Sequence, residues 1–132
     1  MQRSRISTPL MFIAVGCAAA AVHFAIALML IRSGLLQPLQ ANVLAWLCAF
    51  AVSFTGHHRL TFRANLAPRT RAAMRFLLVS AGAFAVNEAA YAALLHWTRL
   101  PYDVALALVL MGVAAFTYLL GRHWAFLGDA AV

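Results

Sequence analysis

One carboxylate lies inside an otherwise apolar stretch of the chain. Glu88 is near the middle of a run from about Met74 to Trp97, where a charge in a membrane is costly unless it is paired or hydrated. Asn87 and Tyr91 have the spacing to share a helix face with it. We favour a functional role, in which Glu88 pairs with His23, carries a proton or hydrogen-bonds the hydroxyl groups of a ligand. The alternative is a structural, hydrogen-bonded carboxyl group.

Two further polar residues lie in earlier apolar runs. When the two halves of the chain are aligned, His23 falls on Asn87, so we expect the two to meet near the membrane midplane. Asn42 stands near the start of its run and could bond across helices or touch a ligand, although packing is the simpler expectation. The predicted intramembrane polar site therefore consists of Glu88, Asn87, His23, Tyr91 and Asn42.

Basic residues gather where the second and fourth apolar runs end. Arg59 and Arg122 follow these runs, with His58 and His123 beside them, and Arg75 begins the third run. Guanidinium groups suit bidentate binding of phosphate, and lipid phosphates lie at this depth. The cluster predicts a lipid-phosphate site. Membrane topology and contact with anionic headgroups explain the same charges without a specific ligand, and both interpretations stay open.

The sequence contains no recognisable catalytic constellation. It has no Ser/His/Asp arrangement, phosphate-binding loop or paired carboxylates, and no His or Cys spacing typical of zinc. Cys17 and Cys48 both lie in apolar runs, where a free cysteine commonly behaves as a small buried hydrophobe. We therefore expect a protein that is not an enzyme and has no metal or cofactor.

The composition predicts a membrane protein. Of 132 residues, 65% are hydrophobic and 10% are charged, whereas soluble domains are about 45–50% apolar, and a small soluble domain cannot hide such an excess. Four apolar runs have the roughly 18–24 residues needed to cross a bilayer. We expect one all-α integral membrane domain over residues 1–132, with four transmembrane helices at about 10–31, 39–56, 74–97 and 104–121.

The arginines predict how these helices are oriented. All ten basic residues are Arg; eight flank the runs on one side, and only Arg32 and Arg99 lie on the other. The positive-inside rule places the eight, and hence both termini, in the cytoplasm. The outer loops are short and contain Pro38 and Pro101, which predicts two tight helical hairpins. Because topology explains the basic charge, we expect no nucleic-acid partner.

The two halves of the chain align at an offset of about 64 residues, which predicts two parallel repeats of one hairpin each. Internal symmetry is common in transporters, but an old duplication without mechanistic content explains it equally well. Gly16 and Ala20 have small-residue spacing that permits close helix approach, within one chain or between copies, and Gly82 suggests the same.

Several of these motifs together resemble a known family. They are Phe12 and Gly16 in the first run, the pair Ala41-Asn42 in the second, and the closing segments HHRLTF at 57–62 and GRHWAF at 121–126. With the length and the hairpin spacing, they resemble the GtrA-like family, which also provides the membrane domain of some dolichyl-phosphate mannose synthases. The resemblance covers about residues 10–127. Two histidines replace the family's Asn-Arg, and Leu60 replaces its Trp.

The resemblance implies a role in cell-surface polysaccharide synthesis. Members of the family are thought to move, or help present, sugars linked to polyprenyl phosphates such as undecaprenyl phosphate across the bacterial inner membrane. We therefore expect a multi-pass inner-membrane carrier (flippase) or accessory protein, in contact with membrane lipids, whose ligand is a polyprenyl-phosphate sugar.

Two other functions stay open. One is a non-transporting membrane anchor that recruits a glycosyltransferase. The other is a small proton-coupled cation exporter built around Glu88. Because four helices form a thin wall, we expect the sugar-lipid carrier to be a homo-oligomer or to work with a partner protein.

Overall fold

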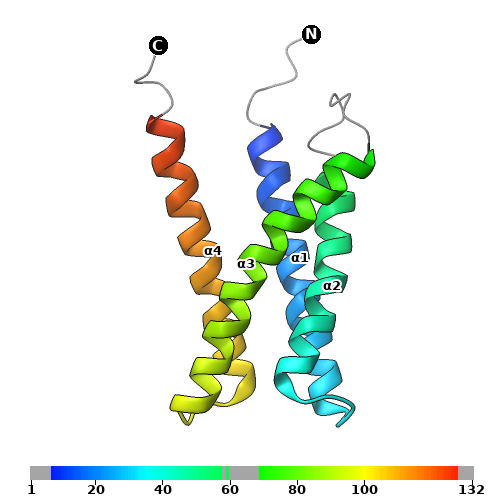
Figure 1. Cartoon of the computed structure of the whole chain (residues 1–132), viewed down its shortest axis with the longest axis vertical. Helices are drawn as coiled ribbons and strands as arrows, with labels where there is room; N and C mark the ends of the chain where they lie inside the picture. Colours follow the sequence, from blue (N-terminus) through cyan, green and yellow to red (C-terminus); the bar gives the residue numbers. More distant parts are fainter. Residues whose placement is uncertain (1–6, 58, 60–68, 128–132) are drawn as a thin grey trace.

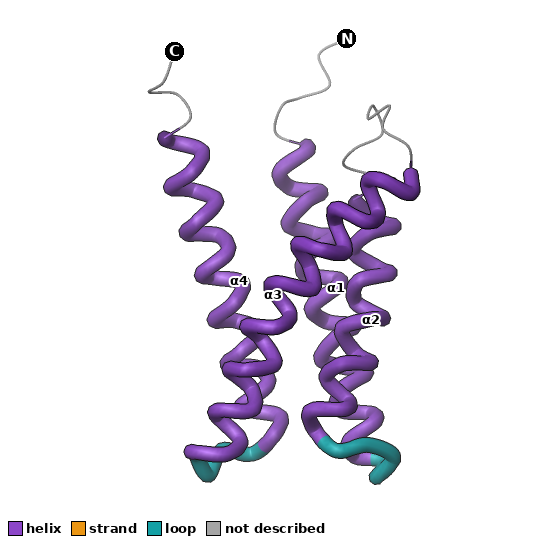
Figure 2. The backbone as a smooth tube through the Cα atoms, in the orientation of Figure 1, coloured by secondary structure: helices purple, strands orange, loops and turns teal. Residues whose placement is uncertain are grey.

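The described chain consists of α-helices joined by short loops. The computed structural model describes residues 7–57, 59 and 69–127, and side chains at 10–57, 59, 71 and 74–116. Its helices are α1 (Ser7–Arg32), α2 (Pro38–Gly56), α3 (Arg69–Trp97) and α4 (Tyr102–Leu127), and these residues contain no strand (Figure 2). The predicted all-helical architecture is confirmed.

Within the described residues, three helices contain apolar segments long enough to cross a membrane: Leu10–Arg32, Pro38–Gly56 and Met74–Trp97. In α4 the apolar segment with described side chains, Tyr102–Phe116, is shorter. Large apolar side chains cover the outside of these helices, which is the pattern of a surface that faces lipid. The protein is therefore a helical membrane protein, as predicted.

Each predicted run lies inside one observed helix, but the helices extend beyond the runs. Helix α3 begins at Arg69 instead of about Met74, and α4 continues to Leu127 instead of about Gly121. Hydropathy marks only the segment that suits lipid, whereas Arg and Ala, which occur in both extensions, are good helix formers in water as well. The helices therefore continue past the apolar segments at the end where α1 begins and α4 ends (Figure 1).

The helices form two hairpins that turn at the same end of the molecule (Figure 1). Helix α3 crosses the molecule: it lies beside α4 near the turns and approaches α2 towards the other end, where α4 diverges from α1 and α2 (Figure 1). The hairpins are thus packed differently. The predicted duplication and the cytoplasmic position of the termini stay predictions.

The closest packing in the molecule joins α1 to α2. The buried positions of α1 repeat every four residues, at Val15, Ala19, His23 and Ala27, and α2 presents small residues at the same interval. These are Ala41, Ala45 and Ala49. Small side chains at such spacing let two helices approach closely.

The small residues at this contact between α1 and α2, here called the seam, are not the ones that were predicted to allow close helix approach. A Cβ atom added to Gly16 or Gly82 would meet nothing within 4 Å, and Ala20 is exposed. Within the chain, the face of α1 that packs is therefore one residue away from the face of Gly16 and Ala20, and contact of that face with a second copy stays a prediction. Within the chain the close approach is made by Gly56, where an added Cβ would lie 2.7 Å from Cγ1 of Val15.

The apolar core lies in the half of the molecule near the turns. Tyr91 and Leu106 are its largest fully buried apolar side chains, and they pack with Ala27, Ala45 and Val109. The first turn follows Arg32 and reverses the chain at Gly34, whose φ of 73° suits a residue without a Cβ. The core and the turns hold α1, α2 and α3 at fixed depths relative to one another.

Candidate functional site

A hydrogen-bonded polar network joins α1, α2 and α3 in the half near the turns. At its centre is Asn42, which is fully buried. Its Oδ1 lies 2.6 Å from Nε2 of His23 on α1. Its Nδ2 donates to Oδ1 of Asn87 at 3.0 Å and to Oε2 of Glu88 at 2.5 Å, both on α3. One side-chain amide therefore ties three helices together.

These contacts determine the hydrogen positions in the network. Because the carbonyl oxygen of Asn42 can only accept, Nε2 of His23 must carry the proton and donate it. The amide nitrogen of Asn42 uses both hydrogens, one for Asn87 and one for Glu88. Every buried side-chain nitrogen or oxygen among the described residues has a hydrogen-bond partner. The buried polar atoms of the network are therefore all paired, so a ligand would have to exchange bonds with them.

The structure changes how the predicted polar residues relate to one another. His23 and Asn87 were expected to meet directly, and Glu88 was a possible partner of His23, but Asn42 stands between them. Of the roles expected for Asn42, the structure shows the bond across helices, and the residue is the hub of the network. Tyr91 does not bond to the hub; it donates to the backbone oxygen of Tyr102 at 3.1 Å.

Tyr91 therefore has a different role from its neighbours in the sequence. Its side chain is fully buried in the apolar core, and its hydroxyl reaches the first residue of α4. A buried hydroxyl needs such a partner, because leaving it without one is costly. Tyr91 locks α3 against the start of α4 beside the polar network.

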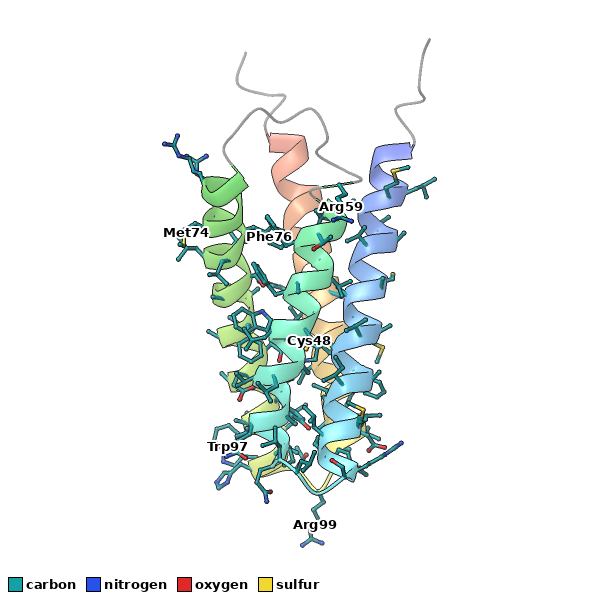
Figure 3. The ribbon with its side chains drawn as sticks, turned by 90° about the vertical axis from the view of Figure 1, so that its right-hand side faces the viewer. Cys48, Arg59, Met74, Phe76, Trp97 and Arg99 are labelled. Carbon is teal, nitrogen blue, oxygen red and sulfur yellow. The ribbon has the colours of Figure 1, made fainter. Side chains whose placement is uncertain are left out.

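Basic side chains lie at the opposite end of the molecule. Arg59 and Arg75 are exposed, and Figure 3 places Arg59 and Phe76 at one end and Trp97 and Arg99 at the other. Along α3, Glu88 and Arg75 are thirteen residues apart in sequence, or about 20 Å of helix. The predicted polar and phosphate sites are therefore two separate places.

Three residues of the predicted phosphate site lack a described side chain. His58 lies outside the described residues. Arg122 and His123 belong to α4, but their side chains are also outside the described part. The structure therefore brings Arg59 and Arg75 to one end of the molecule and leaves the other predicted members of the site as predictions.

His57 is next to the basic residues in sequence but points into the helices. It is buried, with its ring 4.6 Å from that of Phe12 on α1 and 5.8 Å from that of Phe76 on α3. Burial lowers the pKa of its imidazole from the ordinary value of 6.5. The neutral ring therefore acts as an aromatic contact among three helices.

A row of aromatic rings between α2 and α3 was not singled out from the sequence. Here it is called the aromatic lane, and it consists of Trp46, Phe50, Phe54, Phe76 and Phe84. The indole N–H of Trp46 also donates to Oγ of Ser80 at 3.0 Å. The signal was present in the spacing, because rings recur every four residues on α2 and every eight on α3.

No cluster of three or more His, Cys, Asp or Glu side chains that could hold a metal occurs within the described ranges. Cys17 and Cys48 are free thiols and are exposed on the helices, instead of buried as their apolar surroundings suggested. In a membrane protein, an exposed position at that depth faces lipid. The network's amides, imidazole and carboxylate instead offer donors and acceptors suited to hydroxyl groups.

Comparison with known proteins gives one match. Residues 11–126 match the family model described as "GtrA/DPMS, transmembrane domain". No curated protein and no solved structure matches the chain. The match extends over all four helices and includes every residue of the polar network and the aromatic lane.

Proposed function

Because this chain belongs to the GtrA/DPMS transmembrane-domain family, as the sequence resemblance indicated, we propose that it carries polyprenyl-phosphate-linked sugars across a bacterial inner membrane. Membership of the family suggests involvement with polyprenyl-phosphate sugars. The protein is a multi-pass membrane protein. Transport by this chain, its non-enzymatic character and the cytoplasmic position of both termini belong to the proposal.

The observation that carries the proposal is the polar network among three membrane-length helices. These helices place His23, Asn42 and Glu88 in one hydrogen-bonded group within an otherwise apolar part of the molecule. Polar and ionisable residues inside a membrane are costly and usually mark a substrate or ion path. Sugar hydroxyls can exchange bonds with each of these groups.

In this proposal each of the two sites binds a different part of the ligand. Arg59, Arg75 and the predicted Arg122, His58 and His123 hold the lipid phosphate at the cytoplasmic end. Glu88, Asn87, Asn42 and His23 bind the sugar hydroxyls as the head group crosses, and Tyr91 holds the adjoining helices. Since four helices form a thin wall, a second copy or a glycosyltransferase partner completes the path.

A transport assay tests this proposal. The purified protein is placed in liposomes with a labelled polyprenyl-phosphate sugar in one leaflet, and its exposure to an impermeant reagent is followed. We expect Glu88→Gln to slow crossing by on the order of tenfold, because a lost hydrogen bond typically costs about 1 kcal/mol or more. We expect a similar loss for Arg59→Ala.

Matched variants separate these effects from general damage. Asp103→Asn makes the same chemical change as Glu88→Gln at the start of α4, and Arg99→Ala removes an arginine at the opposite end from Arg59 (Figure 3). Both should retain transport. If the folded wild-type protein moves none of several sugar lipids, the carrier proposal is wrong.

The complete pairing of the buried polar atoms favours one alternative to transport. Because every buried polar side-chain atom among the described residues already has a partner, the network can also act purely to hold three helices together. The protein would then be a membrane anchor that recruits a glycosyltransferase. That function predicts copurification with the enzyme and normal polysaccharide synthesis in the Glu88→Gln variant.

A further inference from the structure

The aromatic lane has no part in the function proposed above. Its rings form a continuous series: Trp46 lies 4.7 Å from Phe84 and 6.3 Å from Phe50, and Phe76 lies 5.7 Å from Phe50 and 6.0 Å from Phe54. These are distances between ring centres, within the range of favourable aromatic pairs. The rings thus form one ordered surface contributed by two helices.

The lane is open along its side. All five rings are partly exposed instead of buried, so their outer parts face the lipid that surrounds the helices. From Trp46 to Phe54 the lane follows eight residues of α2, or about 12 Å of helix. It is long enough to contact an extended chain and not only a single group.

One end of the lane meets the basic residues. Phe76 follows Arg75 directly in α3, and Phe54 stands a little more than one turn before the exposed Arg59. From there the rings run towards the middle of the membrane-length segments. A lipid whose phosphate lay between these arginines would therefore extend its chain along the lane.

The chemistry of the lane suits an apolar ligand better than a sugar. Apart from Trp46 and Ser80, its surface offers only carbon, and those two side chains bond to each other. A sugar site needs several free donors and acceptors beside its rings. Methyl-branched, unsaturated chains instead lie against ring faces through dispersion contacts, and their stiffness reduces the entropy lost on binding.

We propose that the aromatic lane binds the isoprenoid chain next to the phosphate and so distinguishes polyprenyl phosphates from phospholipids with straight acyl chains. This inference rests on the proposed function for its choice of ligand. It concerns binding of the lipid chain, however, and requires neither a sugar nor transport.

Lipid binding in nanodiscs tests the inference without a sugar. Sugar-free polyprenyl phosphate competes against phosphatidic acid with saturated chains, and native mass spectrometry measures how much of each is bound. Both lipids carry a phosphate monoester, so the comparison matches the charged group and varies the apolar part of the lipid. We expect the wild-type protein to prefer polyprenyl phosphate, and Phe50→Leu/Phe76→Leu to reduce that preference by about fivefold or more, given typical energies of aromatic contacts.

Phe116→Leu is the matched control, because Phe116 is exposed on α4 and is not part of the lane. It should leave the preference unchanged. Equal binding of both lipids by the wild-type protein, or an equal loss in the control and the double variant, would overturn the inference.

Photocrosslinking answers the question even if the double variant fails to fold. A polyprenyl phosphate with a photoreactive group in its first isoprene units is bound to the wild-type protein, and the labelled peptides are identified. Labelling should concentrate in residues 46–54 and 76–84; labelling spread evenly over α1 and α4 contradicts the inference. Preferential binding without sugar transport would instead refute the proposed function and leave the lane's role standing.

Discussion

At the scale of single residues, Asn42 is the most informative position. Its side chain is fully buried, which is expected only if each hydrogen-bonding atom is used, and its carbonyl oxygen and both amide hydrogens have partners. In membranes such bonds average about 0.6 kcal/mol each. Because Asn42 makes three such bonds, it contributes more to the stability of the fold than its partners Asn87 and Glu88 on α3.

We predict that Asn42→Leu lowers the free energy of unfolding by roughly 2 kcal/mol, the sum of three such bonds. Asn87→Leu removes one bond from the same network and should cost about a third as much. Thermal unfolding in detergent measures both variants. Equal losses would show that the hub assignment is wrong.

His57 predicts a dependence of stability on pH. Burial lowers the pKa of its imidazole below the ordinary 6.5, so the unfolded chain binds a proton at a higher pH than the folded one. The stability contributed by the neutral ring is therefore full above about pH 6.5 and is lost as the pH falls through the lowered pKa. The melting temperature should decrease over that range.

Two variants isolate the contribution of His57. His57→Phe keeps an aromatic ring against Phe12 and Phe76 but cannot titrate, so its melting temperature should change less between neutral and acidic pH. His96→Gln removes an exposed histidine at the other end of α3 and should behave as wild type. An identical pH profile for wild type and His57→Phe would exclude this role.

At the scale of helices, the contact between α1 and α2 depends on a glycine. Gly56 lies where α2 meets Val15, and an added Cβ would approach Cγ1 of that valine to 2.7 Å. The small residues of α2 at intervals of four continue the same close approach towards the turn. This seam sets the depth at which Asn42 meets His23.

We predict that Gly56→Ala destabilises the protein by about 1–3 kcal/mol, the usual cost of overpacking. Val15→Ala in the same chain should recover part of that loss, because it removes the clashing methyl groups. The four proteins form a double-mutant cycle measured by thermal unfolding.

Gly16→Ala serves as the control for this cycle. An added Cβ at Gly16 meets nothing within 4 Å, and alanine favours a helix by about 1 kcal/mol over glycine. That variant should be neutral or slightly stabilised. Additive effects of Gly56→Ala and Val15→Ala would contradict the proposed contact.

At the scale of the whole molecule, the hairpins share one direction but not one packing. Both turn at the same end, while α3 leaves α4 and crosses towards α2 (Figure 1). The polar network is built from α1, α2 and α3, and the described part of α4 contributes Leu106 and Val109 to the apolar core instead. The hairpin α1–α2 and the hairpin α3–α4 therefore have different roles in the structure.

The predicted orientation can be tested by labelling cysteines in intact cells. In a chain with Cys17→Ala and Cys48→Ala, we expect Arg99→Cys to react with an impermeant thiol reagent from outside. Arg71→Cys, which is exposed at the start of α3, should react only after the membrane is permeabilised. The reverse pattern would place the termini outside the cytoplasm.

The sequence by itself determined that the protein is helical and membrane-embedded, roughly where each helix lies, and to which family it belongs. Those properties follow from local composition, from the length of each apolar run and from motifs within single segments. It also identified His23, Asn87 and Glu88 as unusual, because a polar residue in an apolar run is conspicuous without a structure.

Only the tertiary structure decided how these residues are joined. Which face of α1 packs, why Asn42 is the hub and where the aromatic lane forms all depend on the rotation, depth and crossing of separate helices. Successive residues of a helix point in directions about 100° apart. The neighbouring residues Val15 and Gly16 therefore face different surroundings: Val15 contacts Gly56, whereas a Cβ added to Gly16 would meet nothing within 4 Å. Contacts between distant segments therefore cannot be obtained from spacing within any one of them.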